Sequence, residues 1–216
     1  MKRGTKSVLF GVHQFIWHPL TVAYAWKTLY GQWPNLYEWI AIFCHDIGYW
    51  GKSAMDSPEG QTHPELGARA ARRLAYRIAR LRHNHNFASA LAEEVYELTL
   101  YHSTHYATKR SAKVSRLYLP DKACVLVEPM WFYLLRASLS GELKEYVDND
   151  NHKRWLVGES EQTSREWLQG YRTRIRAKVA AHFAQLAKRS IHELRLLLDR
   201  ALGDTRKCEC DICLEK

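Results

Sequence analysis

The chain has 216 residues, of which 46% are hydrophobic and 25% are charged, an ordinary mixture for a globular protein. This length supports one well-buried core and is short for two. No run of about 18 uncharged apolar residues occurs, which excludes a membrane-spanning helix, and the apolar run 8–12 is too short for a secretory signal. We therefore expect a cytoplasmic protein that does not bind membranes. The formal net charge of +9 favours an anionic partner, although a generic basic protein would carry it too.

Apolar periodicity and helix-breaking residues predict an all-α fold, with one helical domain over residues 1–203 and a tail over 204–216. The expected helices cover residues 19–30, 35–46, 62–81, 87–102, 120–138 and 161–202, with a short helix that ends near residue 146. Glycine, proline and polar residues predict loops over 48–61 and 103–112 and a turn over 148–151. The last helix is the longest, so the prediction is a helical bundle with a long C-terminal helix.

The cysteines fall into two groups. Cys44 and Cys124 lie in apolar runs, where we expect buried reduced thiols. Cys208, Cys210 and Cys213 cluster in the tail and could bind a soft metal ion, but structural zinc usually has four ligands and no fourth ligand is evident. A reduced tail is therefore favoured over a metal site.

The pair His45 and Asp46 follows the apolar run 40–44, where a carboxylate and an imidazole are costly to bury unless a positive group neutralises them. Residues that could complete a metal site are spread along the chain: His18, His63, His102 and Asp121. Their spacing is too long for a zinc finger, but a helical bundle can bring them to one point. Imidazoles with carboxylates suit iron, manganese, cobalt or zinc, with magnesium possible. Six ligands favour two divalent ions bridged by Asp46.

Two of these ligand positions have a rival. His13 lies five residues before His18 and could replace it, and His105 could replace His102. In either case His45 and Asp46 form the central pair, to which we assign the catalytic role.

The ordered set resembles the HD superfamily of metal-dependent phosphohydrolases. The segments around His18-Pro19, Cys44-His45-Asp46-Ile47-Gly48 and Pro120-Asp121-Lys122 are similar to family motifs. His63-Pro64-Glu65-Leu66-Gly67 and Tyr101-His102 are similar to elements of the dinuclear branch, which includes cyclic-dinucleotide phosphodiesterases and small symmetrical dinucleoside-polyphosphate hydrolases. The resemblance covers roughly residues 13–146.

This resemblance implies an enzyme that cleaves a phosphoester or phosphoanhydride bond of a nucleotide or dinucleotide with a metal-activated hydroxide. Two departures bear on the substrate. Tyr49 stands where many relatives have a lysine, and Lys52 is the nearest lysine that could substitute. The Gly-Tyr-Pro element of the cyclic-di-GMP branch is absent after His102, so we do not assign that substrate.

Basic residues near the candidate ligands are expected to bind substrate phosphates. Lys109, Lys113 and Arg116 lie in the segment between His102 and Asp121, and Lys122 follows Asp121 directly. With Lys52, these four residues make up the predicted substrate-binding set. The basic face formed by Arg69, Arg73, Arg77 and Arg80 is more simply a solvated helix surface.

Two other functions stay open. A di-iron oxygenase could use the same ligand set, and a non-catalytic module could bind nucleotides or, less favourably, nucleic acid through its basic faces. Six convergent ligands argue against the second alternative, because binding alone does not need them. A homo-oligomer is possible under each function.

Overall fold

The computed structural model describes residues 1–201; the side chains of residue 192 and of residues 194–201 are not described. Every regular element in that part of the chain is a helix, which confirms the predicted all-α fold. None of the described helices is long and apolar enough to cross a membrane. The predicted tail, with Cys208, Cys210 and Cys213, lies outside the described residues.

Contacts within the chain group it into two compact units, residues 1–175 and 176–216. The first unit holds all the candidate ligands, and the described part of the second is the continuation of one helix. The predicted single domain over 1–203 stays a prediction. In chain order the elements are α1 (Arg3–Phe10), α2 (Trp17–Tyr30), α3 (Leu36–Cys44), the short 3-10 helices η1 (Ile47–Tyr49) and η2 (Gly60–Thr62), α4 (His63–Arg80), α5 (His85–Leu100), α6 (Thr104–Lys109), α7 (Tyr118–Ala123), η3 (Cys124–Leu126), α8 (Met130–Ser140), α9 (Glu142–Leu156) and α10 (Ser164–Ala201).

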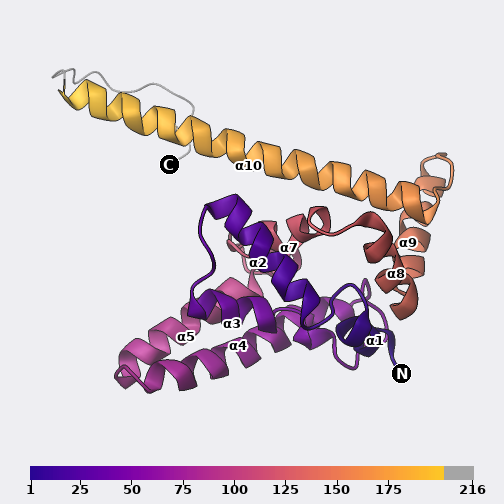
Figure 1. The fold of residues 1–216 in the computed structure, drawn as a ribbon, viewed down its shortest axis with the longest axis horizontal. Helices are drawn as coiled ribbons and strands as arrows, with labels where there is room; N and C mark the ends of the chain where they lie inside the picture. Colours follow the sequence, from indigo (N-terminus) through magenta and orange to yellow (C-terminus); the bar gives the residue numbers. More distant parts are fainter. Residues whose placement is uncertain (202–216) are drawn as a thin grey trace. The chain divides into compact units, whose positions relative to one another are not determined.

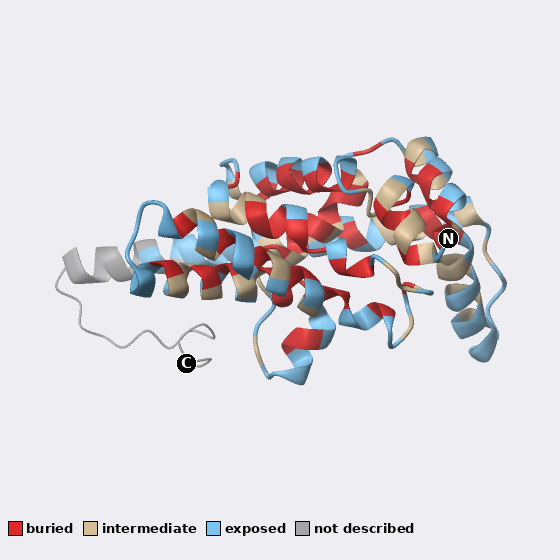
Figure 2. Ribbon diagram, turned by 90° about the horizontal axis from the view of Figure 1, so that it is seen from below, coloured by how far each residue is buried: buried red, intermediate tan, exposed pale blue. Residues whose placement is uncertain are grey.

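Helices α4 and α5 lie side by side as an antiparallel pair, which α3 contacts (Figure 1). Ala71 and Ala75 on α4 and Ala92 on α5 are buried in the core that these helices share. Because these side chains are small, the helix axes can approach closely, and Trp26 of α2 and Ile42 of α3 fill the remaining volume. Figure 2 shows buried and exposed residues on opposite sides of the same helices, as expected for amphipathic helices around one core.

The start of α3 is defined by a capping box. The side chain of Asn35 accepts hydrogen bonds from the backbone N–H groups of Tyr37 and Glu38, and Glu38 accepts one from the N–H of Asn35. This arrangement satisfies amide groups that the first helical turn leaves unpaired. The cap fixes the residue at which α3 begins. Because His45 and Asp46 directly follow the C-terminal end of this helix, the cap also helps to fix their position.

Three predictions about the elements were wrong. The predicted helix 120–138 is divided into α7, η3 and α8, and the break before α8 falls at Pro129, which disfavours helical geometry at the residue before it. The predicted loop 103–112 contains α6, where burial of Tyr106 stabilises the helix. The predicted turn 148–151 lies inside α9, where Asn149 donates to Asp56 and Asn151 bonds to the backbone of Gln162, so these side chains do not compete for their own backbone.

Candidate metal centre

His45 and Asp46 reach the same point because they directly follow Cys44, the last residue of α3. The N–H of His45 still donates to Ala41 at 3.0 Å, so His45 continues the helix, whereas Asp46 has φ −101° and ψ −2° and leaves it. Adjacent residues inside a helix would point about 100° apart. At this helix end, Nε2 of His45 lies 3.1 Å from Oδ2 of Asp46.

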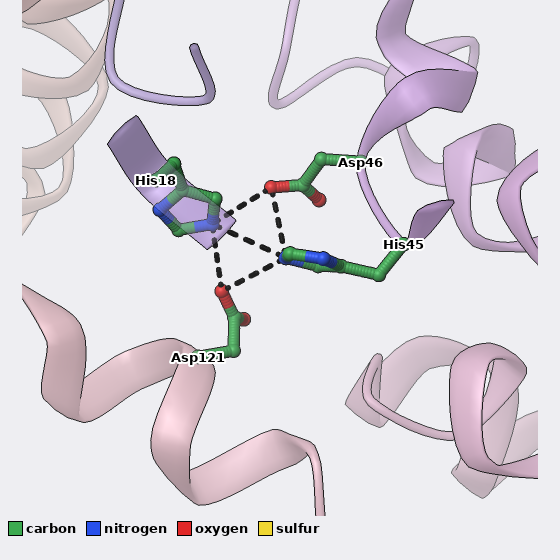
Figure 3. Close-up of side chains that lie close together, drawn as sticks. All are labelled: His18, His45, Asp46 and Asp121. Carbon is green, nitrogen blue, oxygen red and sulfur yellow. Dashed lines mark hydrogen bonds and ion pairs between the residues drawn. The ribbon is translucent and has the colours of Figure 1, made fainter. Parts of the chain in front are cut away.

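Figure 3 shows how His18 from α2 and Asp121 from α7 complete this group. Nε2 of His18 lies 3.0 Å from Oδ2 of Asp46 and 3.3 Å from Oδ1 of Asp121. Nε2 of His45 lies 3.4 Å from Oδ1 of Asp121 and 3.1 Å from Nε2 of His18. All four side chains are buried. Four donor atoms from three helices therefore converge on one point.

These separations suit a metal ion. Ligand atoms bonded at about 2.1 Å lie about 3.0 Å apart along the edge of an octahedron and about 3.4 Å apart along the edge of a tetrahedron. The five measured separations run from 3.0 to 3.4 Å. Oδ2 of Asp46 is also buried without a hydrogen-bond partner among the described residues. A buried carboxylate oxygen in that state is costly unless a cation occupies the centre.

A second group forms on the other oxygen of the same carboxylate. Oδ1 of Asp46 lies 3.5 Å from Nε2 of His63, the first residue of α4, and 3.8 Å from Nε2 of His102, which follows α5. Both histidines are buried. Ligand atoms of these three residues lie within 4.8 Å of one another. Asp46 therefore belongs to two ligand groups, one on each of its oxygens.

Backbone carbonyl groups fix the orientation of three of the imidazoles. Nδ1 of His45 lies 2.6 Å from the carbonyl oxygen of Ile42, and the corresponding distances are 2.8 Å for His63 to Gly60 and 2.5 Å for His102 to Thr99. Because a carbonyl oxygen only accepts, Nδ1 carries the proton in each ring, and Nε2 is left to face the ligand group. Hydrogen bonds of this kind are typical of metal-bound histidine.

For His18, the atom that Nδ1 contacts is a sulfur atom instead of a backbone carbonyl oxygen. Nδ1 of His18 lies 3.6 Å from Sγ of Cys124, while that thiol donates to the carbonyl oxygen of Asp121 at 2.9 Å. The sulfur lone pairs are therefore available to accept from His18. Cys44 and Cys124 are both buried and free, as the sequence predicts.

The two ligand groups differ in charge when no metal ion is present. Burial alone would lower the pKa of His45, but the carboxylates of Asp46 and Asp121 raise it to about 9. The pKa of His18 is likewise raised well above its ordinary value, because Cys124, Asp121 and Asp46 outweigh its burial. Conversely, burial lowers the pKa of His63 well below its ordinary value and that of His102 to about 4. At neutral pH the imidazole rings of His18 and His45 are therefore protonated, whereas those of His63 and His102 are neutral.

Two glycines allow the close backbone packing that forms the centre. A Cβ atom on Gly48 would lie 2.1 Å from the carbonyl oxygen of His63, and one on Gly67 would lie 2.5 Å from that of Cys44. Gly67 therefore lets α4 rest against the end of α3, four residues after His63. This contact is the physical reason for a glycine at that position of the His-Pro-x-x-Gly segment.

The structure places His18 and His102, rather than their rivals, in the ligand groups. His105 is exposed beside Tyr106. His13 lies outside both groups, with Nε2 3.9 Å from Oδ2 of Asp46. Its Nδ1 lies 2.8 Å from Oε1 of the fully buried Glu142, which also accepts from Ser7 and from the N–H of Val12. Sequence patterns gave no sign of this Glu142–His13 contact, because 129 residues separate the two.

A cavity of about 360 Å³ lies beside the centre, with His13 and Lys122 in its wall. Nζ of Lys122 lies 2.9 Å from Oδ2 of Asp121. Burial would lower the pKa of Lys122, but Asp121 raises it well above its ordinary value, so the ammonium group stays charged. Of the five residues predicted to bind substrate, Lys122 is the one that lines this cavity.

The other four predicted substrate residues lie elsewhere, and their roles stay predictions. Lys52 donates to Thr62 at 2.8 Å. Arg116 is exposed, lies 3.5 Å from Glu38 and packs over the ring of Trp26. Lys109 and Lys113 are exposed residues of α6 and the segment after it.

Comparisons of this chain with protein-family models, with curated proteins and with solved structures found no match. The resemblance to the HD superfamily therefore rests on the residues quoted above. Independently of it, the fold and the site define an all-helical protein with buried histidine and aspartate groups that could hold metal ions.

Proposed function

We propose that the protein is a metal-dependent phosphohydrolase that cleaves a phosphoester or phosphoanhydride bond of a nucleotide or dinucleotide. The observation that carries the proposal is the sharing of Asp46 between two buried ligand groups. A carboxylate that faces one group with each oxygen suits two ions a few ångströms apart, the arrangement common among enzymes that hydrolyse phosphate esters.

The chain provides the other parts that such a reaction needs. Bound divalent ions would supply Lewis acidity and lower the pKa of water. Lys122, charged and in the cavity wall, would bind a phosphoryl oxygen and offset its negative charge. His13 faces the same cavity, and Glu142 holds its ring in place. The net charge of +9 favours the approach of an anionic substrate.

The test is a phosphate-release screen on the purified full chain after metal analysis, with nucleoside mono-, di- and triphosphates, dinucleoside polyphosphates and cyclic dinucleotides. We expect release with manganese or iron, and loss of release in the Asp46→Asn variant. His105→Ala is the matched control, because it removes an exposed histidine outside both ligand groups. Oxygen uptake without phosphate release would contradict the proposal and favour a di-iron oxygenase. Nucleotide binding without turnover that survives Asp46→Ala would favour a binding module.

A further inference from the structure

Half of the residues that line the cavity beside the metal centre lie outside the segment that resembles the HD superfamily. His13 and Lys122 connect it to Asp46 and Asp121 at distances of 3.9 and 2.9 Å. The rest of its wall includes Lys153 of α9 and Trp167, Tyr171 and Arg174 of the first turns of α10. All these residues belong to the first compact unit. A ligand in the cavity would therefore contact the centre and the α9–α10 segment at once.

One part of this wall is aromatic. The rings of Tyr146 and Trp167 lie 5.6 Å apart with an interplanar angle of 17°, and those of Trp167 and Tyr171 lie 5.8 Å apart at 7°. Tyr133 and Tyr49 add two further rings to the lining. Aromatic side chains that line a pocket can contact a flat ligand ring and bury part of its area.

Another part of the wall carries two cationic side chains, Lys153 and Arg174, together with the carboxylates Asp56 and Asp150. In the described part of the chain, neither Lys153 nor Arg174 forms an ion pair, although both line the cavity. The two carboxylates accept hydrogen bonds from neutral amides, Asp56 from Asn149 at 3.3 Å and Asp150 from Gln162, and neither forms an ion pair in the described part of the chain. Lys153 and Arg174 are exposed and outside any ion pair in the described part of the chain, so both are available to bind an anionic group of a ligand in the cavity.

The size of the cavity limits that ligand. Its volume of about 360 Å³ lies at the lower end of the range of about 300–1,000 Å³ for small-ligand pockets. A cavity near the lower end of this range is better matched to one nucleoside with its phosphates than to two. A phosphate at Lys122 would lie beside the metal centre, which leaves Lys153 and Arg174 for a second anionic group.

We propose that this cavity selects a single nucleoside that carries two or more phosphates, with Lys153 and Arg174 binding an anionic group other than the one at the metal centre. The base would rest on the aromatic wall. The identification of this ligand as the substrate rests on the proposed function; its binding does not.

The experiment measures binding without turnover. Isothermal titration calorimetry follows adenosine 5′-diphosphate, adenosine 5′-monophosphate and inorganic pyrophosphate binding to the full chain in EDTA. We expect the diphosphate nucleotide to bind more tightly than either of the other two. Lys153→Ala and Arg174→Ala should each weaken its binding about tenfold, the usual effect of losing one hydrogen bond to a charged group. The same two substitutions should weaken binding of the monophosphate less than binding of the diphosphate.

Matched controls lie on the same helices. Lys144→Ala on α9 and Arg165→Ala on α10 remove exposed cations that do not line the cavity, so both should bind the diphosphate like the wild-type chain. Circular dichroism checks that all four variants fold.

Several results would overturn the inference: no binding of the diphosphate by the wild-type chain, unchanged affinity in Lys153→Ala and Arg174→Ala, or equal affinity for the diphosphate and pyrophosphate. Failure of the proposed function is a separate result. A chain that binds the diphosphate as expected but releases no phosphate with any metal ion loses the proposed function and keeps the inference. A chain that releases phosphate while both variants bind normally loses the inference alone.

Discussion

Oδ2 of Asp46 lies 3.0 Å from Nε2 of His18, although the two residues come from the end of α3 and the first turn of α2. Despite this short distance, Oδ2 has no hydrogen bond of acceptable geometry in the described part of the chain. Both atoms face a common centre rather than each other. A cation at that centre would satisfy both.

The two ligand groups should lose their ions independently. His63→Ala and His102→Ala each remove one ligand from the group on Oδ1 of Asp46 and leave the four-residue group intact. We expect each variant to retain one ion and to lose the second, with activity reduced at least a hundredfold, because a two-ion site stabilises both the attacking and the leaving oxygen. Metal content by mass spectrometry and the phosphate-release rate check this. Normal two-ion occupancy in these variants would rule out His63 and His102 as ligands.

Metal binding at pH 7 should release protons from the first group. The pKa of His18 is raised well above its ordinary value and that of His45 to about 9, so both rings are protonated at pH 7 and must lose a proton to bind an ion. His63 and His102 have lowered pKa values and are already neutral. Affinity for the first ion should therefore rise as pH increases from 6.5 towards 9, and that for the second should change little.

Calorimetric titrations in buffers of different ionisation enthalpy measure the proton release. His63→Ala is the control, since it keeps the first group and should keep the release. Metal affinity that does not change between pH 6.5 and 9 would contradict the assignment of protons to His18 and His45.

The metal-free protein should lose stability as the pH falls from about 6.5 to about 4. Burial lowers the pKa of His102 to about 4 and also lowers that of His63, so the unfolded chain takes up these protons first. The loss is of order 3 kcal/mol for His102, at about 1.4 kcal/mol for each pKa unit. His18 and His45 do not contribute in this window, because their stabilisation is fully present below 6.5 and is lost only as the pH rises.

Asp46 and Asp121 contribute below that window. Their pKa values are lowered well below the ordinary range, despite burial, by neighbours such as His45 and Lys122, so their stabilisation persists until the pH falls below about 4. Urea unfolding of the metal-free chain at several pH values measures the slope of the free energy of unfolding against pH. His102→Gln should reduce it, and a wild-type slope in that variant would exclude His102 as its cause.

Gly67→Ala should destabilise the protein and weaken metal binding together. The added Cβ would lie 2.5 and 2.6 Å from the carbonyl oxygens of Cys44 and His45, so the backbone of α3 or α4 must move. Overpacking of this kind costs about 1–3 kcal/mol, and here it displaces the His45 backbone as well. Thermal unfolding and metal titration measure the two effects. Gly170→Ala, whose Cβ meets only Nη1 of Arg174 at 3.8 Å, should leave both unchanged or raise stability slightly.

The sequence predicts the candidate centre better than it predicts its surroundings. Histidine and aspartate at the ends of predicted helices are recognisable from residue type, and His18, His45 and Asp121 do come together with Asp46. The helix predicted over 120–138 runs through Pro129, although a proline is recognisable in the sequence as a helix-breaking residue. By contrast, α9 continues through 148–151 because of contacts with Asp56 and Gln162, which no local pattern contains.

The cavity wall was beyond prediction for a similar reason. The prediction for Lys109 and Lys113 rests on their place between two ligands in the chain, and position along a chain does not determine which residues line a cavity. Lys153 and Arg174 line the cavity although they lie in helices α9 and α10, well after Asp121, the last candidate ligand in the chain. Only the packing of α9 and the first turns of α10 places them there.

If Asp46 joins two metal ions, the metal content of the chain must depend on this carboxylate. The measurement is the ratio of metal to protein, by mass spectrometry, for the wild-type chain, Asp46→Asn and the control His105→Ala after loading with manganese or iron and removal of free ions. We predict about two ions per chain for the wild-type chain and the control, and loss of both ions in Asp46→Asn. A wild-type chain without bound metal, or an Asp46→Asn variant that keeps two ions, would contradict the account.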